Sequence, residues 1–137
     1  VYKRQVFDGV KDMLAALKNA GKRLAVATSK PIKFTNMIVK GFDLEKYFDV
    51  VGGASSDASK EAKCDVIDDV LCRLSVKDKS KVLMVGDRMY DIDGAHICGV
   101  DVCAILYGYG DRKEFEEHGA EYILSSPKDV VSIVLER

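Results

Sequence analysis

Apolar residues along the chain follow two alternating patterns. In one they recur every three or four positions, as on the buried face of an amphipathic helix. In the other they form short continuous runs, as in strands that are buried on both faces of a parallel sheet. The first pattern predicts helices over residues 8–20, 31–41, 60–74, 91–98, 111–118 and 126–134. The second predicts strands over residues 24–27, 48–53, 82–85, 100–106 and 122–124.

Strands and helices therefore alternate from one end of the chain to the other, which is typical of βαβ units. The alternation predicts an α/β fold with a doubly wound, Rossmann-like parallel sheet flanked by helices. No linker, internal repeat or low-complexity segment interrupts it, so we interpret residues 1–137 as a single domain.

The run Val82–Val85 reads as a central strand of that sheet, and acidic residues follow it. Gly86 allows a sharp turn, and Asp87 then stands outside the carboxyl end of the strand, where open α/β sheets bind ligands. Asp91 follows as the next helix begins. Both aspartates also suit a helix cap, so a structural role stays open at this point.

Two other predicted elements bring polar groups to the same edge of the sheet. The strand over 24–27 runs into Thr28 and Ser29, while Lys60 and Lys63 lie at the start of a helix, where their charge opposes the helix dipole. Hydroxyls, a lysine and paired carboxylates together describe a site for a phosphate and Mg²⁺, because Mg²⁺ prefers carboxylate oxygens and a phosphoryl group needs donors and positive charge. Each residue alone has an ordinary explanation as a cap or a surface group.

The near-neutral charge of the chain favours small molecules over nucleic acid or a membrane as its partners. The net charge is −1, which offers no basic face for nucleic acid or an anionic membrane. No apolar run approaches the length of a membrane helix or a signal-peptide core, so we expect a cytoplasmic protein. Four cysteines without C-x-x-C spacing are expected to be free and structural, and His96 and His118 lack metal-like spacing.

Several motifs resemble those of the haloacid dehalogenase superfamily, which consists mostly of Mg²⁺-dependent phosphatases. Thr28–Pro31, Lys63 and Gly86–Asp91 are similar to its second, third and fourth motifs. Leu106–Gly110 and Gly119–Ile123 are similar to the phosphoglycolate-phosphatase-like branch. The resemblance implies hydrolysis of a small phosphomonoester, such as phosphoglycolate, through an aspartyl-phosphate intermediate.

The resemblance also implies roles for individual residues. Thr28 would bond a phosphoryl oxygen with help from the Ser29 amide, and Lys63 would neutralise charge on the nucleophile and phosphate. Asp87 would ligate Mg²⁺, and Asp91 would orient the lysine or a metal-bound water, which places both carboxylates at the metal. Lys63 fits the family spacing better than Lys60, which stays open as the alternative.

One departure from the family pattern is large. Its first motif, Asp-x-Asp-x-Thr, supplies the nucleophile and the general acid/base, and the sequence does not contain it. The strand that carries this motif is the central one in the family fold, and the cap domain that selects the substrate is absent as well. We therefore expect an incomplete core domain that has no turnover alone and that recruits a strand from a missing N-terminal segment or from a second copy.

Two alternatives remain open. One is a phosphate- or metal-binding regulatory module without turnover. Receiver domains use similar groups, but they place the acidic pair after the first strand, whereas here the hydroxyl precedes the acids. The other is a sugar-phosphate mutase of the same superfamily, which only the absent cap would exclude.

Overall fold

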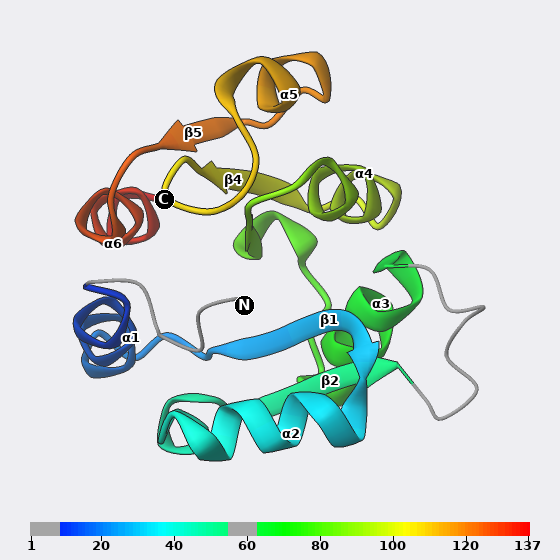
Figure 1. Cartoon of the computed structure of the whole chain (residues 1–137), viewed down its shortest axis with the longest axis vertical. Coiled ribbons are helices and arrows are strands. Elements are labelled where there is room, and N and C mark those ends of the chain that lie inside the picture. The colour runs from blue at the N-terminus through cyan, green and yellow to red at the C-terminus, as the bar shows by residue number, and fades with distance from the viewer. Residues whose placement is uncertain (1–8, 55–62) are drawn as a thin grey trace.

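The computed structural model describes residues 9–54 and 63–137 and shows helices alternating with parallel strands (Figure 1). The helices are α1 (Val10–Asn19), α2 (Ile32–Gly41), α3 (Lys63–Arg73), α4 (Met89–Ile97), α5 (Arg112–Glu117) and α6 (Pro127–Glu136). The strands are β1 (Ala25–Pro31), β2 (Val50–Ala54), β3 (Leu83–Gly86), β4 (Asp101–Ile105) and β5 (Tyr122–Leu124). Short 3₁₀ turns, η1 (Glu45–Tyr47) and η3 (Lys79–Lys81), precede β2 and β3. The predicted α/β class is confirmed. Lys60, the alternative to Lys63 as the lysine of the site, lies outside the described residues.

The strands form two sheets instead of one. β1 pairs with β2 in parallel, and β3, β4 and β5 make a second parallel sheet in that order. Within the described ranges no ladder of hydrogen bonds joins β1 to β3. A cavity of about 550 Å³ lies between them, lined by Ala25 and Ala27 of β1 and by Leu83–Val85 of β3. We call this cavity the slot, and it is the arrangement that a missing central strand predicts.

The sequence predicts a central position for β3, and this is wrong for the part of the chain that the structure describes. β3 hydrogen-bonds only to β4 within its sheet, so it is an edge strand whose other edge faces the slot. Its apolar composition nevertheless fits a strand with neighbours on both sides, because Leu83–Val85 line the slot as well as pairing with β4.

Helices hold the two sheets together. α3 packs against β1 and β2, α4 packs against β3 and β4, and the two helices contact each other. In Figure 1, α1 and α6 contact each other on the opposite side of the strands from α3 and α4. The main buried cluster comes chiefly from α3, α4 and β4 and is closed by a ring from α5. Its members are Ile67, Leu71, Ile92, Ala95, Cys98, Val100, Val102, Ala104 and Phe115.

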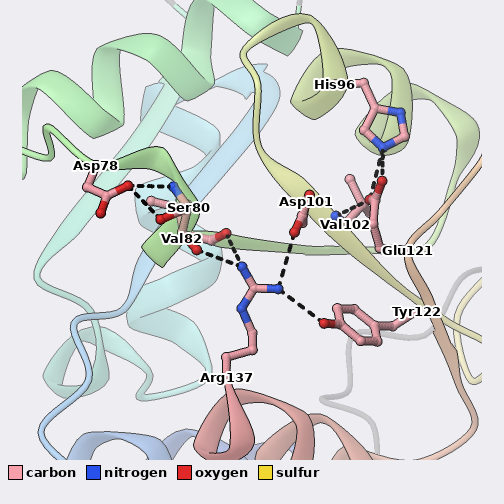
Figure 2. Close-up of polar contacts among 9 residues, drawn as sticks. All are labelled: Asp78, Ser80, Val82, His96, Asp101, Val102, Glu121, Tyr122 and Arg137. Atoms are coloured by element: carbon pink, nitrogen blue, oxygen red, sulfur yellow. Dashed lines mark hydrogen bonds and ion pairs between the residues drawn. The ribbon is translucent and has the colours of Figure 1, made fainter.

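Two polar side chains tie the amino-terminal ends of the second sheet (Figure 2). The Arg137 guanidinium donates to the carbonyl oxygens of Ser80 at 3.0 Å and Val82 at 3.3 Å, and it also pairs with Asp101 of β4 at 3.4 Å. A charged fork that bonds several acceptors at once is a use for which arginine is suited. The end of α6 is thereby fastened to β3 and β4.

The Glu121 carboxylate forms the second tie. It accepts the backbone N–H of Val102 at 2.7 Å and lies 3.0 Å from Nε2 of His96 (Figure 2). His118 makes a similar contact with Asp93, at 2.9 Å. Each of the two histidines thus has a carboxylate partner on another element.

Element boundaries differ from the predicted ones by a few residues. Pro31 is predicted in the first helical turn, but its ψ of 139° is extended, so it ends β1 and α2 begins at Ile32. Gly99 follows α4 with φ of 79°, a left-handed conformation that glycine adopts without strain and that stops the helix as predicted.

All four cysteines are free, as predicted. Among the described helices, none has the length and apolar character needed to cross a bilayer.

Candidate active site

The groups that the sequence predicts to meet do so at one cavity. A hollow of about 960 Å³ is lined by Thr28 and Ser29 from β1, Lys63 from the start of α3, and Asp87 and Asp91 after β3. The slot is lined by earlier residues of β1 and β3, and this hollow by the residues that end them. The two strands therefore run in the same direction along one gap, and their carboxyl ends open into the hollow. We call this hollow the site.

The Lys63–Asp91 pair is the most enclosed charged contact of the site. The Nζ atom of Lys63 lies 2.8 Å from Oδ1 of Asp91, and each side chain is only 14% exposed. The other oxygen, Oδ2, accepts the backbone N–H groups of Asp87 at 3.1 Å and Arg88 at 3.3 Å. Asp91 thus caps the start of α4 and pairs with the Lys63 ammonium group at the same time.

Asp87 is held from the loop that follows β4. Its Oδ2 atom accepts the backbone N–H of Tyr109 at 3.0 Å, and its main-chain carbonyl accepts the N–H of Gly110 at 2.8 Å. The backbone of this loop is therefore bonded to both the carboxylate and the main chain of Asp87.

The hydroxyl groups lie across the gap from the aspartates. Oγ1 of Thr28 accepts the backbone N–H of Lys30 at 3.2 Å, which fixes the turn at the end of β1 and leaves the hydroxyl proton to be donated to a ligand. Thr28 is half-buried and Ser29 is exposed. Thr28, Ser29 and Lys63 therefore line the same cavity.

Glycines make room for the charged side chains. A Cβ on Gly86 would lie 2.6 Å from Cγ of Asp91, and a Cβ on Gly94 would lie 2.8 Å from Cβ and Cγ of Lys63. Both distances are shorter than real Cβ contacts allow. The close approach of Lys63 and Asp91 thus depends on two positions without side chains, one at the end of β3 and one in α4.

The sequence does not predict the ion pair between Arg88 and Glu114, which lies beside the site. The carboxylate of Glu114 in α5 accepts Nε of Arg88 at 3.0 Å and the N–H of Met89 at 2.7 Å. The hydrogen bond and charge of Glu114 raise the pKa of Arg88 above its usual value. Glu114 lies in an acidic run that reads as a solvated helix face, and no sequence signal marks its contact with a residue 26 positions away.

The donor set fits Mg²⁺ only in part. Among the described residues no cluster of three or more metal-ligating side chains is assembled. Asp87 contributes one carboxylate oxygen, Oδ1, to which no described residue donates a hydrogen bond, whereas both oxygens of Asp91 have partners. Mg²⁺ in phosphoryl-transfer sites is commonly held by one or two carboxylates together with waters and substrate oxygens, so Asp87 suits one of its ligands.

The chain is similar to a known family and to several known proteins. Residues 2–105 match the family model described as haloacid dehalogenase-like hydrolase. The chain is 43% identical over 110 residues to the tyrosine-protein kinase PtkA of Mycobacterium tuberculosis and 35% identical over 118 residues to a 5′-nucleotidase of Pseudomonas aeruginosa. A phosphoglycolate phosphatase of Colwellia psychrerythraea is 29% identical over 117 residues.

Solved structures share the fold. A crystal structure described as a "predicted phosphatase" from Clostridium acetobutylicum superposes with a TM-score of 0.92 at 37% identity, over 97% of this chain. The chain spans only 61% of that protein, 37% of PtkA, 53% of the 5′-nucleotidase and 51% of the phosphoglycolate phosphatase.

Proposed function

Because this chain belongs to the haloacid dehalogenase-like hydrolase family, we propose that its whole protein hydrolyses a small phosphomonoester such as phosphoglycolate. The observation that carries the proposal is the enclosed Lys63–Asp91 pair, which shares one cavity with Thr28 and Asp87. A cation that is fixed beside donors at strand ends suits a transferring phosphoryl group, whose charge is spread over three oxygens.

Each residue has a distinct task in this proposal. Thr28 donates its hydroxyl to a phosphoryl oxygen, assisted by the Ser29 amide. Lys63 offsets the negative charge of the phosphate and of the nucleophile, while Asp91 keeps the ammonium group in place. Because Asp91 also bonds two N–H groups of the turn after β3, the lysine is positioned by the backbone of the site itself.

Asp87 is the proposed ligand for Mg²⁺, through Oδ1. When bound, Mg²⁺ supplies additional positive charge for the phosphoryl oxygens. Asp91 is a weaker candidate for a ligand than the resemblance implies, because Lys63 and two backbone N–H groups already occupy its oxygens.

The nucleophile is proposed to come from a strand that fills the slot. The slot runs between two strand edges and is open to the site at their carboxyl ends, so a parallel strand seated there would place its last residues beside Asp87 and Thr28. An aspartate at that point would attack phosphorus as the P–O bond to the substrate alcohol breaks, so that the alcohol leaves with a proton from a general acid or from water. Water would then hydrolyse the aspartyl-phosphate to inorganic phosphate and the free aspartate. The 137 residues alone are accordingly expected to have no turnover.

The test is hydrolysis of p-nitrophenyl phosphate, with and without Mg²⁺, by the full-length protein and by the 137-residue chain. We expect Mg²⁺-dependent turnover only in the full-length form, and a loss of at least about 100-fold in Lys63→Met. The exposed Lys40→Met variant is the matched control and should keep its activity. Steady turnover by the 137 residues would refute the assignment of the nucleophile, and an active Lys63→Met would refute the role of the lysine.

A second candidate function is phosphoryl transfer to tyrosine. It is favoured by the 43% identity to PtkA, whose name describes a tyrosine kinase. The two functions share charge stabilisation at phosphorus and differ in the acceptor, which is water in one and a phenol in the other. Incubation with radiolabelled ATP and a tyrosine peptide separates them, because a kinase labels the peptide and a phosphatase does not.

A further inference from the structure

The loop after β4 grips Asp87 at two points. The N–H of Tyr109 donates to the carboxylate Oδ2 at 3.0 Å, and the N–H of Gly110 donates to the main-chain carbonyl of the same residue at 2.8 Å. We call residues 108–110 the Gly108–Gly110 loop. One bond fixes the backbone of Asp87 and the other fixes its side chain, so the loop determines both the place and the rotation of the carboxylate.

Both glycines of the loop are required for space. A Cβ on Gly108 would overlap the Cβ and Oδ2 atoms of Asp87. A Cβ on Gly110 would overlap the Asp87 carbonyl oxygen and would lie 2.6 Å from Cε1 of Phe115. Neither glycine has a left-handed φ, so close approach and not backbone conformation is what these positions need.

The loop also contacts the core. Phe115 is fully buried, and a Cβ on Gly110 would meet its ring as well as the Asp87 carbonyl oxygen, so Gly110 packs closely against both. Because the ring belongs to the main buried cluster, the position of Gly110 beside Asp87 is tied to the packing of that cluster.

The Gly108–Gly110 loop bonds only one of the two carboxylate oxygens of Asp87. Oδ2 is occupied by the Tyr109 amide, whereas Oδ1 has no hydrogen-bond donor among the described residues. The geometry points to a positioning role: the Gly108–Gly110 loop presents Oδ1 of Asp87 to a divalent cation, and Gly108 is the residue that sets this orientation. The inference rests on the proposed function, since it assumes that Asp87 binds the metal. Partners that orient a ligand in this way typically change metal affinity 10- to 100-fold when they are lost.

The experiment measures binding of Mn²⁺, as a spectroscopic probe for the Mg²⁺ site, by electron paramagnetic resonance on the full-length protein. In Gly108→Ala the new methyl group displaces the Asp87 side chain from the Tyr109 amide, and we expect about tenfold weaker Mn²⁺ binding. Gly41→Ala is the matched control, because Gly41 has no atom within 4 Å of an added Cβ and its φ is not left-handed. Its Mn²⁺ affinity should stay within twofold of the unmodified protein.

A second measurement avoids any loss of folding in the variant. In the unmodified protein, Mg²⁺ should shift the amide proton signal of Tyr109 and leave that of Gly41 in place. Equal Mn²⁺ affinity in Gly108→Ala, or an unmoved Tyr109 signal in a protein that binds Mg²⁺, overturns the positioning role while phosphatase activity stands. An unmodified protein that binds neither ion overturns the inference together with its metal site, and p-nitrophenyl phosphate turnover in the same sample then reports separately on the proposed function.

Discussion

The Lys63–Asp91 pair is expected to stabilise the fold as well as to serve the site, and a double-mutant cycle measures this contribution. The variants are Lys63→Met, Asp91→Asn and the double substitution. At 2.8 Å, and with an effective dielectric constant of about 20, the direct attraction of the two charges is about 6 kcal/mol. Desolvation of two side chains that are each 14% exposed offsets more than half of it. We therefore expect a coupling free energy of about 2–3 kcal/mol.

The assay is urea unfolding followed by circular dichroism, from which the coupling free energy is the departure of the double variant from additivity. The exposed pair Asp69–Arg73 is the matched control. Its atoms lie 3.5 Å apart and its side chains are 59% and 49% exposed, so its coupling should be only about 0.3–0.5 kcal/mol. A Lys63–Asp91 coupling as small as that of the control would refute the reasoning, because the enclosure of the pair would then have no energetic effect.

Three further predictions concern stability. Phe115→Ala leaves a cavity at a fully buried position and should lower the free energy of unfolding, measured in urea, by about 3–5 kcal/mol. A loss below about 1 kcal/mol would contradict the close packing of the ring, because such cavities usually cost about 3 kcal/mol or more. For Glu121, burial raises the pKa, but the bonds from His96 and the Val102 N–H outweigh it and the net pKa is lowered from 4.5. The ionised Glu121 thus stabilises the folded state above pH 4.5, and this stabilisation is lost as the pH falls through the lower folded pKa. The free energy of unfolding of the unmodified protein should therefore exceed that of Glu121→Gln by less as the pH falls. A difference in the free energy of unfolding that does not change with pH would contradict this role of Glu121. Arg137→Lys removes the guanidinium group that bonds the carbonyls of Ser80 and Val82 just before β3, and it should lower the free energy of unfolding by about 1–2 kcal/mol. An unchanged melting temperature would show that these bonds do not stabilise the fold.

The fold class and most of the site follow from local patterns. Helical and strand spacings reveal the element order because each element buries one face or one run of residues, whatever its neighbours are. Parallel strands bring their carboxyl ends to one edge, so groups that follow different strands converge there, which predicts Thr28, Asp87 and Asp91. Lys63 lies at a helix start and is preferred to Lys60 because it fits the spacing of the family that the sequence resembles. The structure places all four at one cavity.

The limits of the prediction have equally physical causes. A one-residue boundary, such as that at Pro31, depends on ψ, and proline restricts only φ. The contact between Glu114 and Arg88 joins two helix starts that are 26 residues apart, and each residue is ordinary in its own helix. No periodicity encodes such a contact, since only the packing of α4 beside α5 creates it.

The sequence by itself determined the alternation of elements, the strand-end positions of the reactive groups and the absence of the first motif. Only the tertiary structure decided that Asp91 bonds Lys63 and the turn together, that the Gly108–Gly110 loop holds Asp87, and that the strands divide into two sheets around the slot. The reason is that spacing along a chain sets which face or end a residue occupies, whereas distances between elements arise from the packing of side chains from several of them at once.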